Sequence, residues 1–555
     1  LDNSKNKLEQ LSLDHEAIIA IQEKIIRAHE ETIKKEKLIS SLLYDRYSDV
    51  MVDNIAWRLS YEKLHIKWFK MGVYVRDRAA YMRAYMKKKR ANGEIKHWRV
   101  YKKEKMMKGN KKDGQNYIAE AKDKGAKLIL SEQKIEDASV IQVKNLRQYI
   151  GELASRFYGH PTKDLETVCV TGTNGKTSCV ESLAQLAHYS GTNCGYLSTI
   201  GVSLDGINVV KDSELTTPDS IFLQKTFSEI LNSGSKLAAL EASSHGLAQK
   251  RLSGTVVKTA ILTSFSHDHL DYHETIEKYE NAKLSLFRDL KPEISIIQID
   301  NPIGSKIYSE LKDLGKTVYS VSNKNEADFR YSFIRTDDHK LDVELFSIYG
   351  QHSFTINTLS SALASNIICS LAALMQDAPN LKKLIEGVKN LKLPKGRMEL
   401  IKLNKENYCC IDYAHTPEAL ECALRELKAS FDGKLCCVFG CGGERDRLKR
   451  PLMGSIVEKY CDKGILTNDN PRSENENVIF KEILSGVKDP ANFIQIKDRE
   501  EAILHGLDLI HKDNLKNILL VAGKGHETYQ EIKNKKLNFN DKEVIFKYLR
   551  GSDAG

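Results

Sequence analysis

Short apolar runs alternate with helix-patterned stretches from about residue 113 onward, and this alternation constrains the fold more than any other feature. A strand that is covered on both faces of a parallel sheet is apolar throughout, so these runs are interpreted as buried strands. They are KLIL, TVCVTG, KLAALEA, KTAILTSF, ISIIQID, NYCCIDYA, KLCCVFG, KGILTND, NFIQIKD and NILLVAG. The alternation predicts parallel sheets in more than one α/β domain. Ligands should bind near the residues that follow the carboxyl ends of these strands.

The length of 555 residues exceeds what one hydrophobic core holds and predicts roughly three or four domains. Hydrophobic residues make up 41% of the chain and charged residues 29%, the balance of an ordinary soluble protein. No apolar run reaches the ~18 residues that a membrane-spanning helix needs, so we expect a cytoplasmic protein. We also expect the protein to be a monomer. The 11 cysteines lack metal-ligand spacing and several lie inside apolar runs, which argues against a disulfide framework.

The positive charge of the chain is concentrated in one segment. Residues 51–112 carry 19 Lys and Arg against 5 Asp and Glu, whereas residues 113–555 carry 57 against 60. Residues 1–106 are helical in pattern and rich in Lys, Arg and Tyr, and they predict an atypical basic helical extension. Such a segment is either a solvated helical surface or a surface for a nucleic-acid backbone.

A strand, a glycine loop and a helix follow one another between Val168 and Tyr189. Glycines let backbone amides wrap phosphate oxygens, and the helix N-terminus adds partial positive charge. Lys176 would neutralise the outer phosphates, and Thr177 would offer its hydroxyl to Mg²⁺. Val170 stands where the strict phosphate-loop pattern has its first glycine. The order of the elements still predicts a nucleotide site.

Two later residues are candidates for metal ligands. Glu241 ends the apolar strand of LEASSHG, and His269 lies just past the strand KTAILTSF. Either residue alone would more often be a hydrogen-bonded structural group. Together with the glycine loop they indicate an ATP and Mg²⁺ site.

Eight ordered motifs resemble the Mur ligase family over about residues 107–555. They are TGTNGKT, EASSHG, HDHLDYH with the helix YENAKLSLF, GRME, DYAHTP, GCGGERDRLKRPLM, DNPRSE and GKGHE. The resemblance implies a multidomain architecture with a central P-loop ATPase-like parallel sheet domain and a C-terminal Rossmann-like domain. It also implies an ATP-dependent ligase that forms an acyl phosphate on a carboxylate and then displaces phosphate with an amine. The diaminopimelate-adding branch of the family matches best, which implies meso-diaminopimelate and UDP-MurNAc-L-Ala-D-Glu as substrates.

The resemblance implies roles for residues of the central region. Thr177 and Glu241 would bind one Mg²⁺, His269 would help to bind a second, and Lys283 would be carbamylated to become a metal ligand. Lys176, Lys283 and His269 would be the catalytic residues. The contacts with ATP would come from Gly172, Thr173, Asn174, Gly175, Lys176, Thr177, Asp412 and His415. The contacts with the UDP-muramoyl dipeptide would come from Thr216, Thr217, Ser243, Gln249 and Arg251.

The choice of amino acid would depend on Arg472 in the motif DNPR. Diaminopimelate differs from lysine by a distal carboxylate, and a guanidinium grips a carboxylate through two parallel hydrogen bonds. The residues that match the family's diaminopimelate contacts are Arg445, Asp469, Asn470, Pro471, Arg472, Gly523 and Glu527.

We predict four regions: 1–106, the basic helical extension; 107–161, a remnant of the UDP-substrate-binding domain; 162–395, the ATP-binding domain; and 396–555, the amino-acid-binding domain. Two departures from the family are evident. The strands that hold the uridine have no counterpart before Lys108, and GQHSFTINTLSSALA keeps an asparagine-rich family pattern only loosely.

Other functions fit parts of the sequence. One alternative is a lysine-adding Mur enzyme or a folylpolyglutamate synthetase, against which DNPR argues. The other is a nucleic-acid-binding protein with an inactive ligase body, against which the intact set of Lys176, Glu241, His269 and Lys283 argues.

Overall fold

The computed structural model describes residues 117–552, apart from 127, 138, 212–214, 267, 377–380, 512–515 and 534. The predicted basic extension of residues 1–106 lies outside the described residues. None of the described helices is long and apolar enough to cross a membrane.

The first described elements precede the large sheet. They are α4 (Ile118–Asp123), β1 (Ile129–Ser131), β2 (Val140–Gln142), α5 (Leu146–Phe157) and α6 (Pro161–Asp164). β1 corresponds to the predicted strand KLIL and pairs in parallel with β2. Pro161, expected near a domain boundary, is the first residue of α6, where a missing N–H costs no helical hydrogen bond.

Residues 166–356 build a sheet of 11 strands in the order β13-β12-β11-β10-β9-β8-β3-β7-β4-β5-β6. The strands from β11 to β4 in this order run parallel, and the outer strands on either side run antiparallel. The strands are β3 (Glu166–Thr171), β4 (Cys194–Ser198), β5 (Gly201–Ser203), β6 (Val209–Lys211), β7 (Leu237–Glu241), β8 (Thr259–Leu262), β9 (Ile294–Gln298), β10 (Thr317–Ser322), β11 (Phe329–Arg335), β12 (Leu341–Ser347) and β13 (Gly350–Ile356).

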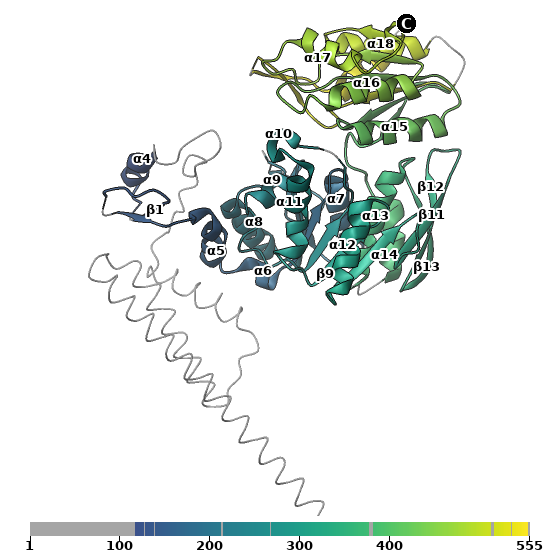
Figure 1. Cartoon of the computed structure of the whole chain (residues 1–555). Helices are drawn as coiled ribbons and strands as arrows, with labels where there is room; N and C mark the ends of the chain where they lie inside the picture. Colours follow the sequence, from purple (N-terminus) through teal and green to yellow (C-terminus); the bar gives the residue numbers. More distant parts are fainter. Residues whose placement is uncertain are drawn as a thin grey trace, which may run out of the picture. The chain divides into compact units, whose positions relative to one another are not determined.

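Helices cover both faces of this sheet (Figure 1). Val168 and Val170 of β3 join a core with the helices α7, α13 and α14, while Cys169 faces the opposite core with α8, α11 and α12. The strand is apolar throughout because both of its faces are buried. The helices are α7 (Lys176–Tyr189), α8 (Ser220–Asn232), α9 (Ser244–Ala248), α10 (Leu270–His273), α11 (Ile276–Arg288), α12 (Pro302–Asp313), α13 (Ser361–Met375), α14 (Leu381–Gly387) and the 3-10 turn η2 (Val388–Asn390).

Residues 399–522 build a second sheet, of 6 strands, in the order β14-β15-β19-β16-β17-β18. β14 runs antiparallel to β15, and the other neighbours are parallel. The strands are β14 (Glu399–Lys402), β15 (Tyr408–Asp412), β16 (Leu435–Phe439), β17 (Lys463–Leu466), β18 (Phe493–Gln495) and β19 (Ile518–Ala522), followed by the hairpin β20 (Tyr529–Ile532) and β21 (Lys535–Asn538).

The second sheet is also covered on both faces. Cys410 and Cys437 join the core formed with α15, α16 and α17, whereas Cys409 and Cys436 join the core formed with α18 and α19. All 11 cysteines are free thiols, as the sequence predicted. The helices are α15 (Pro417–Ser430), α16 (Lys449–Tyr460), α17 (Glu476–Leu484), α18 (Arg499–His511), α19 (Asp541–Ser552) and the 3-10 turn η3 (Pro490–Asn492).

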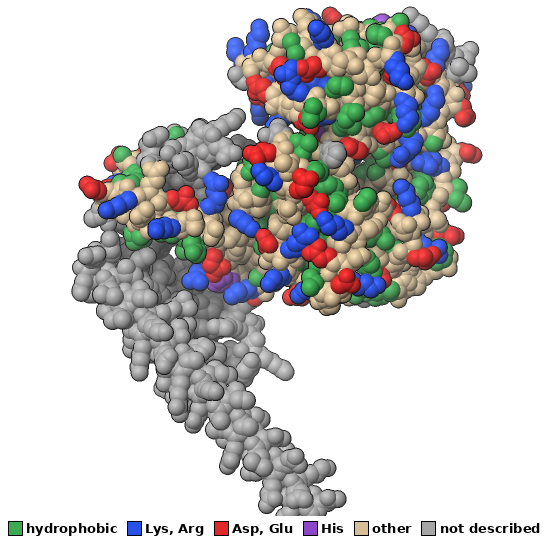
Figure 2. Space-filling model, in the orientation of Figure 1, with side chains coloured by type: hydrophobic (Ala, Val, Ile, Leu, Met, Phe, Trp, Pro, Cys, Tyr) green, Lys and Arg blue, Asp and Glu red, His purple; other side chains and the backbone are tan. Residues whose placement is uncertain are grey.

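The surface of the described part mixes both signs of charge. Figure 2 shows Lys and Arg side chains interspersed with Asp and Glu on the visible face. This agrees with the nearly balanced 57 basic and 60 acidic residues of positions 113–555.

The predicted α/β fold class with two parallel-sheet regions is confirmed. The strands β4, β5, β6 and β10–β13 were not predicted, and they extend the first sheet on both sides of its centre. The neighbouring strands β7, β3 and β8 end at the same edge. That edge therefore collects the glycine loop, Glu241 and the segment that leads to His269.

Candidate functional site

The glycine loop joins β3 to α7 and requires glycine at both of its ends. Gly172 has φ +152°, and a Cβ there would lie 2.1 Å from Thr263 Oγ1. Gly175 has φ +88°, and a Cβ there would lie 2.4 Å from Asn366 Oδ1. Larger residues would therefore force the loop away from its neighbours.

The helix that follows the loop begins without a side-chain cap. Thr173 N and Asn174 N donate to the carbonyl and hydroxyl oxygens of Ser264, at 3.0 Å each. The first amides of α7 have no partner within the helix, as in any helix, and α7 supplies no capping side chain. These amides suit the oxygens of a phosphate.

Two lysines meet at the same carbonyl oxygen of the loop. Lys176 Nζ donates to Gly172 O and Thr173 O at 2.9 Å each, and Lys283 Nζ donates to Gly172 O at 2.7 Å. Lys283 is 1% exposed and lies 4.6 Å from the centre of the Tyr279 ring. Burial, reinforced by the charge of Lys176, holds the pKa of Lys283 well below its usual range. Burial also lowers the pKa of Lys176.

Glu241 is oriented by three hydrogen bonds. Its Oε1 accepts from Thr177 Oγ1 at 2.8 Å and from Thr199 N at 2.7 Å, and its Oε2 accepts from Thr199 Oγ1 at 3.2 Å. The carboxylate and the Thr177 hydroxyl thus present adjacent oxygen atoms, which are the ligands that Mg²⁺ prefers. This donor set fits one Mg²⁺ ion.

His269 precedes the first residue of α10 and has its backbone in the left-handed region, at φ 54°. Its Nε2 lies 3.4 Å from Asp268 Oδ2, and its ring contacts that of His245, with 4.8 Å between centres. Burial lowers the pKa of His269 to about 3, so the imidazole is neutral near pH 7 and can offer a lone pair.

Among the residues that the structure describes, no three His, Cys, Asp or Glu side chains are grouped to hold a metal. A second cation at this site would therefore depend on Lys283. As an ammonium beside Lys176 this side chain does not fit a cation, whereas as a carbamate it would add oxygen ligands.

The residues expected to bind the muramoyl dipeptide form one polar cluster beside Glu241. Thr217 Oγ1 donates to Glu241 O at 2.7 Å and lies 2.9 Å from Ser243 Oγ. Arg251 donates to Thr217 O and, through Nη2, to Gln249 Oε1 at 2.8 Å. Thr199 Oγ1 lies 3.2 Å from Thr216 Oγ1, which completes the cluster.

Asp412 and His415 follow β15 in the second sheet. Asp412 Oδ2 accepts from Met398 N at 2.7 Å, and burial raises the pKa of Asp412 to about 6. Lys449 Nζ donates to His415 O at 2.8 Å. Asn174 Nδ2 lies 3.5 Å from Thr416 Oγ1, so the segment 412–416 meets the glycine loop.

Three loops converge at the carboxyl ends of β16, β17 and β19. A Cβ on Gly523 would lie 2.5 Å from Asp469 Oδ2, and a Cβ on Gly442 would lie 3.1 Å from Arg472 Nη1 and 3.6 Å from Arg445 Cγ. Glycine at both positions lets the loops approach one another. The expected amino-acid contacts are therefore brought together.

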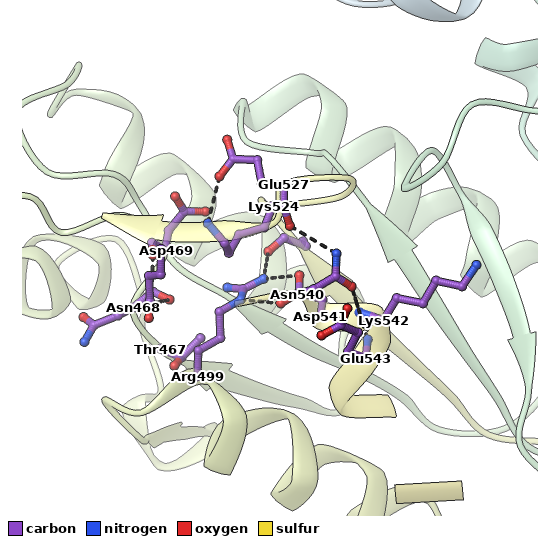
Figure 3. A network of polar contacts seen from close by, with 12 residues as sticks. Thr467, Asn468, Asp469, Arg499, Lys524, Glu527, Asn540, Asp541, Lys542 and Glu543 are labelled. Atoms are coloured by element: carbon purple, nitrogen blue, oxygen red, sulfur yellow. Dashed lines mark hydrogen bonds and ion pairs between the residues drawn. The ribbon is translucent and has the colours of Figure 1, made fainter. Parts of the chain in front are cut away.

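Glu527 lies within a network of polar contacts (Figure 3). Its Oε2 accepts from Lys524 Nζ at 2.8 Å and from Asn470 Nδ2 at 3.0 Å. Arg499 and Asp541 form a fully buried ion pair in the same view, at 2.7 Å between Nε and Oδ1. Arg499 Nη2 also donates to Ala522 O at 3.0 Å, just before the loop that carries Glu527.

Several residues of the site were not predicted. Thr199 orients Glu241, and Asn366 of α13, two residues beyond the loosely kept family pattern, packs against Gly175. Lys524 was visible inside the motif GKGHE, but its complete burial was not. The pairing of Arg499 with Asp541 joins positions 42 residues apart and has no local signal in the sequence.

Two family models match the chain. The one described as "Mur ligase middle domain" matches residues 170–374, and "Mur ligase, glutamate ligase domain" matches residues 396–525. The first range holds the glycine loop, Glu241, His269 and Lys283. The second holds Asp412 and Arg472.

Curated proteins match at moderate identity over most of their length. The chain is 37% identical over 448 residues to UDP-N-acetylmuramoyl-L-alanyl-D-glutamate--2,6-diaminopimelate ligase of Coxiella burnetii, covering 79% of this chain and 90% of that protein. The protein of the same name from Rickettsia bellii is 39% identical over 441 residues, covering 78% and 90%.

Solved structures share the fold. A UDP-N-acetylmuramoyl-L-alanyl-D-glutamate--2,6-diaminopimelate ligase superposes with a TM-score of 0.57 at 31% identity, covering 79% of this chain and 90% of that one. A folylpolyglutamate synthase of Mycobacterium tuberculosis, solved with ADP and AMPPCP, gives a TM-score of 0.56 at 16% identity and covers 68% and 92%. At that identity the likeness shows the fold alone.

Proposed function

This chain belongs to the Mur ligase family, and from that premise we propose that it is an ATP-dependent ligase that adds meso-diaminopimelate to UDP-MurNAc-L-Ala-D-Glu in peptidoglycan synthesis. The relatives named above carry this activity in their names. One observation carries the proposal at the level of this chain. The loops beside β19 bring together Arg472, Asn470 and Glu527. These side chains suit the carboxylate and the ammonium at the distal end of diaminopimelate.

The central region, residues 162–395, would bind ATP. The uncapped start of α7 and the ammonium of Lys176 suit the phosphate oxygens. Thr177 and Glu241 would hold Mg²⁺, with His269 and carbamylated Lys283 at a second ion. Bound there, the ions would neutralise charge on the transferred phosphoryl group.

The reaction would proceed in two steps. The D-glutamate side-chain carboxylate attacks the γ-phosphorus of ATP, which gives an acyl phosphate and ADP. The amine of diaminopimelate then attacks the acyl carbon, loses a proton and displaces phosphate to leave an amide. Lys176 would stabilise the phosphoryl charge in the first step.

The dipeptide carboxylate would enter beside Glu241. Arg251 and the hydroxyls of Thr216, Thr217 and Ser243 already form one hydrogen-bonded cluster at that position. These donors suit the oxygens of a peptide or a carboxylate. Residues 107–161 would contribute what remains of the UDP-binding domain.

Residues 396–555 would bind the amino acid. Asp412 and His415 would contact the nucleotide from this side, since the neighbouring Thr416 reaches Asn174 of the glycine loop. Glu527 would accept from the distal ammonium of diaminopimelate, and Arg472 would bind its distal carboxylate.

The test is phosphate release by the full chain with ATP, UDP-MurNAc-L-Ala-D-Glu and a panel of diaminopimelate, lysine and glutamate. We expect turnover with diaminopimelate, and Arg472→Ala should lower kcat/KM for it about 100-fold, as for loss of a charge-assisted contact, while KM for ATP stays near the wild-type value.

The exposed Arg425 of α15 provides the matched control, and Arg425→Ala should behave as wild type. Equal turnover of lysine and diaminopimelate by the wild-type protein would refute the assignment. So would an Arg472→Ala variant that loses ATP and diaminopimelate use in parallel.

A further inference from the structure

The hairpin β20–β21 is hydrogen-bonded to the segment that carries Arg472. Gln530, which is buried, donates through Nε2 to Asn468 O at 3.1 Å and to Asp469 O at 2.9 Å. Glu531 N donates to Asn470 Oδ1 at 2.8 Å. The hairpin is therefore hydrogen-bonded to three consecutive residues of this segment, Asn468 to Asn470.

Arg472 takes part in this pairing through its backbone. Arg472 N donates to Glu531 O at 3.0 Å, and Lys533 N donates to Arg472 O at 2.7 Å. Arg472 has a φ of 53°, in the left-handed region that non-glycine residues avoid. Such a conformation persists only where the surroundings hold it, and here the two hydrogen bonds to the hairpin do so.

The carboxylate of Glu531 meets the guanidinium of Arg472. Glu531 Oε2 lies 3.0 Å from Arg472 Nε, and the two side chains are 26% and 19% exposed. Solvent and salt screen a pair of this exposure less than one on the open surface. The ion pair between Glu531 and Arg472 therefore keeps more of its attraction than a fully exposed pair would.

The opposite side of the guanidinium is also held. Arg472 Nη1 donates to Gly443 O at 2.7 Å and lies 3.4 Å from Asn470 O. Nη2 donates no hydrogen bond to any residue in the described part of the chain. The guanidinium is therefore held at Nε and Nη1, which leaves Nη2 for a ligand.

We propose that Glu531 is a positioning residue that orients Arg472 and so determines selectivity for an amino acid with a distal carboxylate. The inference rests on the proposed function, in which Arg472 binds that carboxylate. An arginine without a fixed partner samples many rotamers and loses this freedom on binding. Glu531 would remove that loss by ordering the side chain before the amino acid arrives.

The test compares Glu531→Ala with Glu531→Gln in the full chain. We expect Glu531→Ala to raise KM for diaminopimelate about tenfold, with kcat and KM for ATP little changed. Glu531→Gln should restore KM to within about threefold, because the amide oxygen keeps the place of the carboxylate oxygen that lies 3.0 Å from Nε. Glu501→Gln, an exposed carboxyl of α18, is the control.

A double-mutant cycle separates this inference from the proposed function. If Glu531 acts through Arg472, Glu531→Ala should add nothing to the loss caused by Arg472→Ala. If Arg472→Ala leaves diaminopimelate use intact, the proposed function fails. If Arg472→Ala is impaired but Glu531→Ala keeps or lowers KM for diaminopimelate, only the positioning role fails.

A structural effect of the substitution is recognised by a parallel rise in KM for ATP or by a lower melting temperature. Either result, seen in Glu531→Ala and not reversed in Glu531→Gln, would overturn the positioning role. Recovery of diaminopimelate KM in Glu531→Gln at unchanged melting temperature would support it.

Discussion

Glu241 accepts a hydrogen bond of 2.8 Å from the hydroxyl of Thr177, although 64 positions separate the two residues in the sequence. The strands β3 and β7 are neighbours in the sheet, so the start of α7 and the end of β7 meet at one edge. The pair places a carboxylate beside the first amides of a helix, where a metal-bound triphosphate would sit.

Glu241→Gln should lower kcat at least about 100-fold, in keeping with the loss of a metal-site group. The amide keeps the shape of the side chain but removes the negative charge that holds Mg²⁺. Phosphate release measured against Mg²⁺ concentration would show a raised requirement for the metal. The exposed Glu326→Gln serves as control, and an unchanged Mg²⁺ dependence in Glu241→Gln would contradict the assigned site.

Lys283 should carry a carbamate when bicarbonate is present. The lowered pKa of its buried amine favours the neutral form, which adds the carbon of CO₂ and releases a proton. Incubation with ¹³C-bicarbonate should give a carbamate signal in the ¹³C spectrum. The signal should vanish in Lys283→Met but persist in Lys278→Met, whose side chain is exposed on the same helix. If the carbamate signal is the same in Lys283→Met and Lys278→Met, the proposed carbamylation of Lys283 is wrong.

Glu181 of α7 should make the stability of the protein depend on pH. Burial, and then the charge of Glu241, raises the pKa of Glu181 from 4.5 to about 7, and its Oε1 has no hydrogen-bond partner among the described residues. The folded state therefore binds this proton more tightly than the unfolded state, so stability falls as the pH rises from 4.5 through 7. The difference amounts to about 3 kcal/mol at most.

Glu181→Gln should remove that dependence. Thermal unfolding should show a larger gain in melting temperature over wild type at pH 8 than at pH 5, because the charged carboxylate is present only at the higher pH. Glu326→Gln should show no such difference. A gain of equal size at both pH values would mean that the effect does not arise from the titration of Glu181.

The free energy of unfolding should fall more when one partner of the buried ion pair Arg499–Asp541 is replaced than when both are replaced. Removing one partner leaves a buried charge without compensation, so Asp541→Asn should destabilise the chain by roughly 3 kcal/mol or more. The double variant Arg499→Met/Asp541→Leu should recover part of the loss. Urea unfolding measures both effects, and a double variant less stable than Asp541→Asn alone would refute this account.

The composition and spacing of the sequence predicted much of the fold and the identity of the candidate side chains. Apolar runs such as TVCVTG predicted parallel strands because the burial of both faces leaves a local signal, and β3 confirms it. The pairing of distant segments left no such signal. Asn366 meets Gly175 only because α13 packs against α7.

The sequence by itself determined the α/β class, the glycine loop and the ordered motifs that carry the family. Each of these depends on residues close together in the chain, where spacing and composition fix local conformation. Only the tertiary structure decided which charges meet: Lys176 with Lys283 at Gly172 O, Arg499 with Asp541, and Arg472 with Glu531. The order of the strands and the way the loops pack against one another set these pairings, and the local sequence predicts neither.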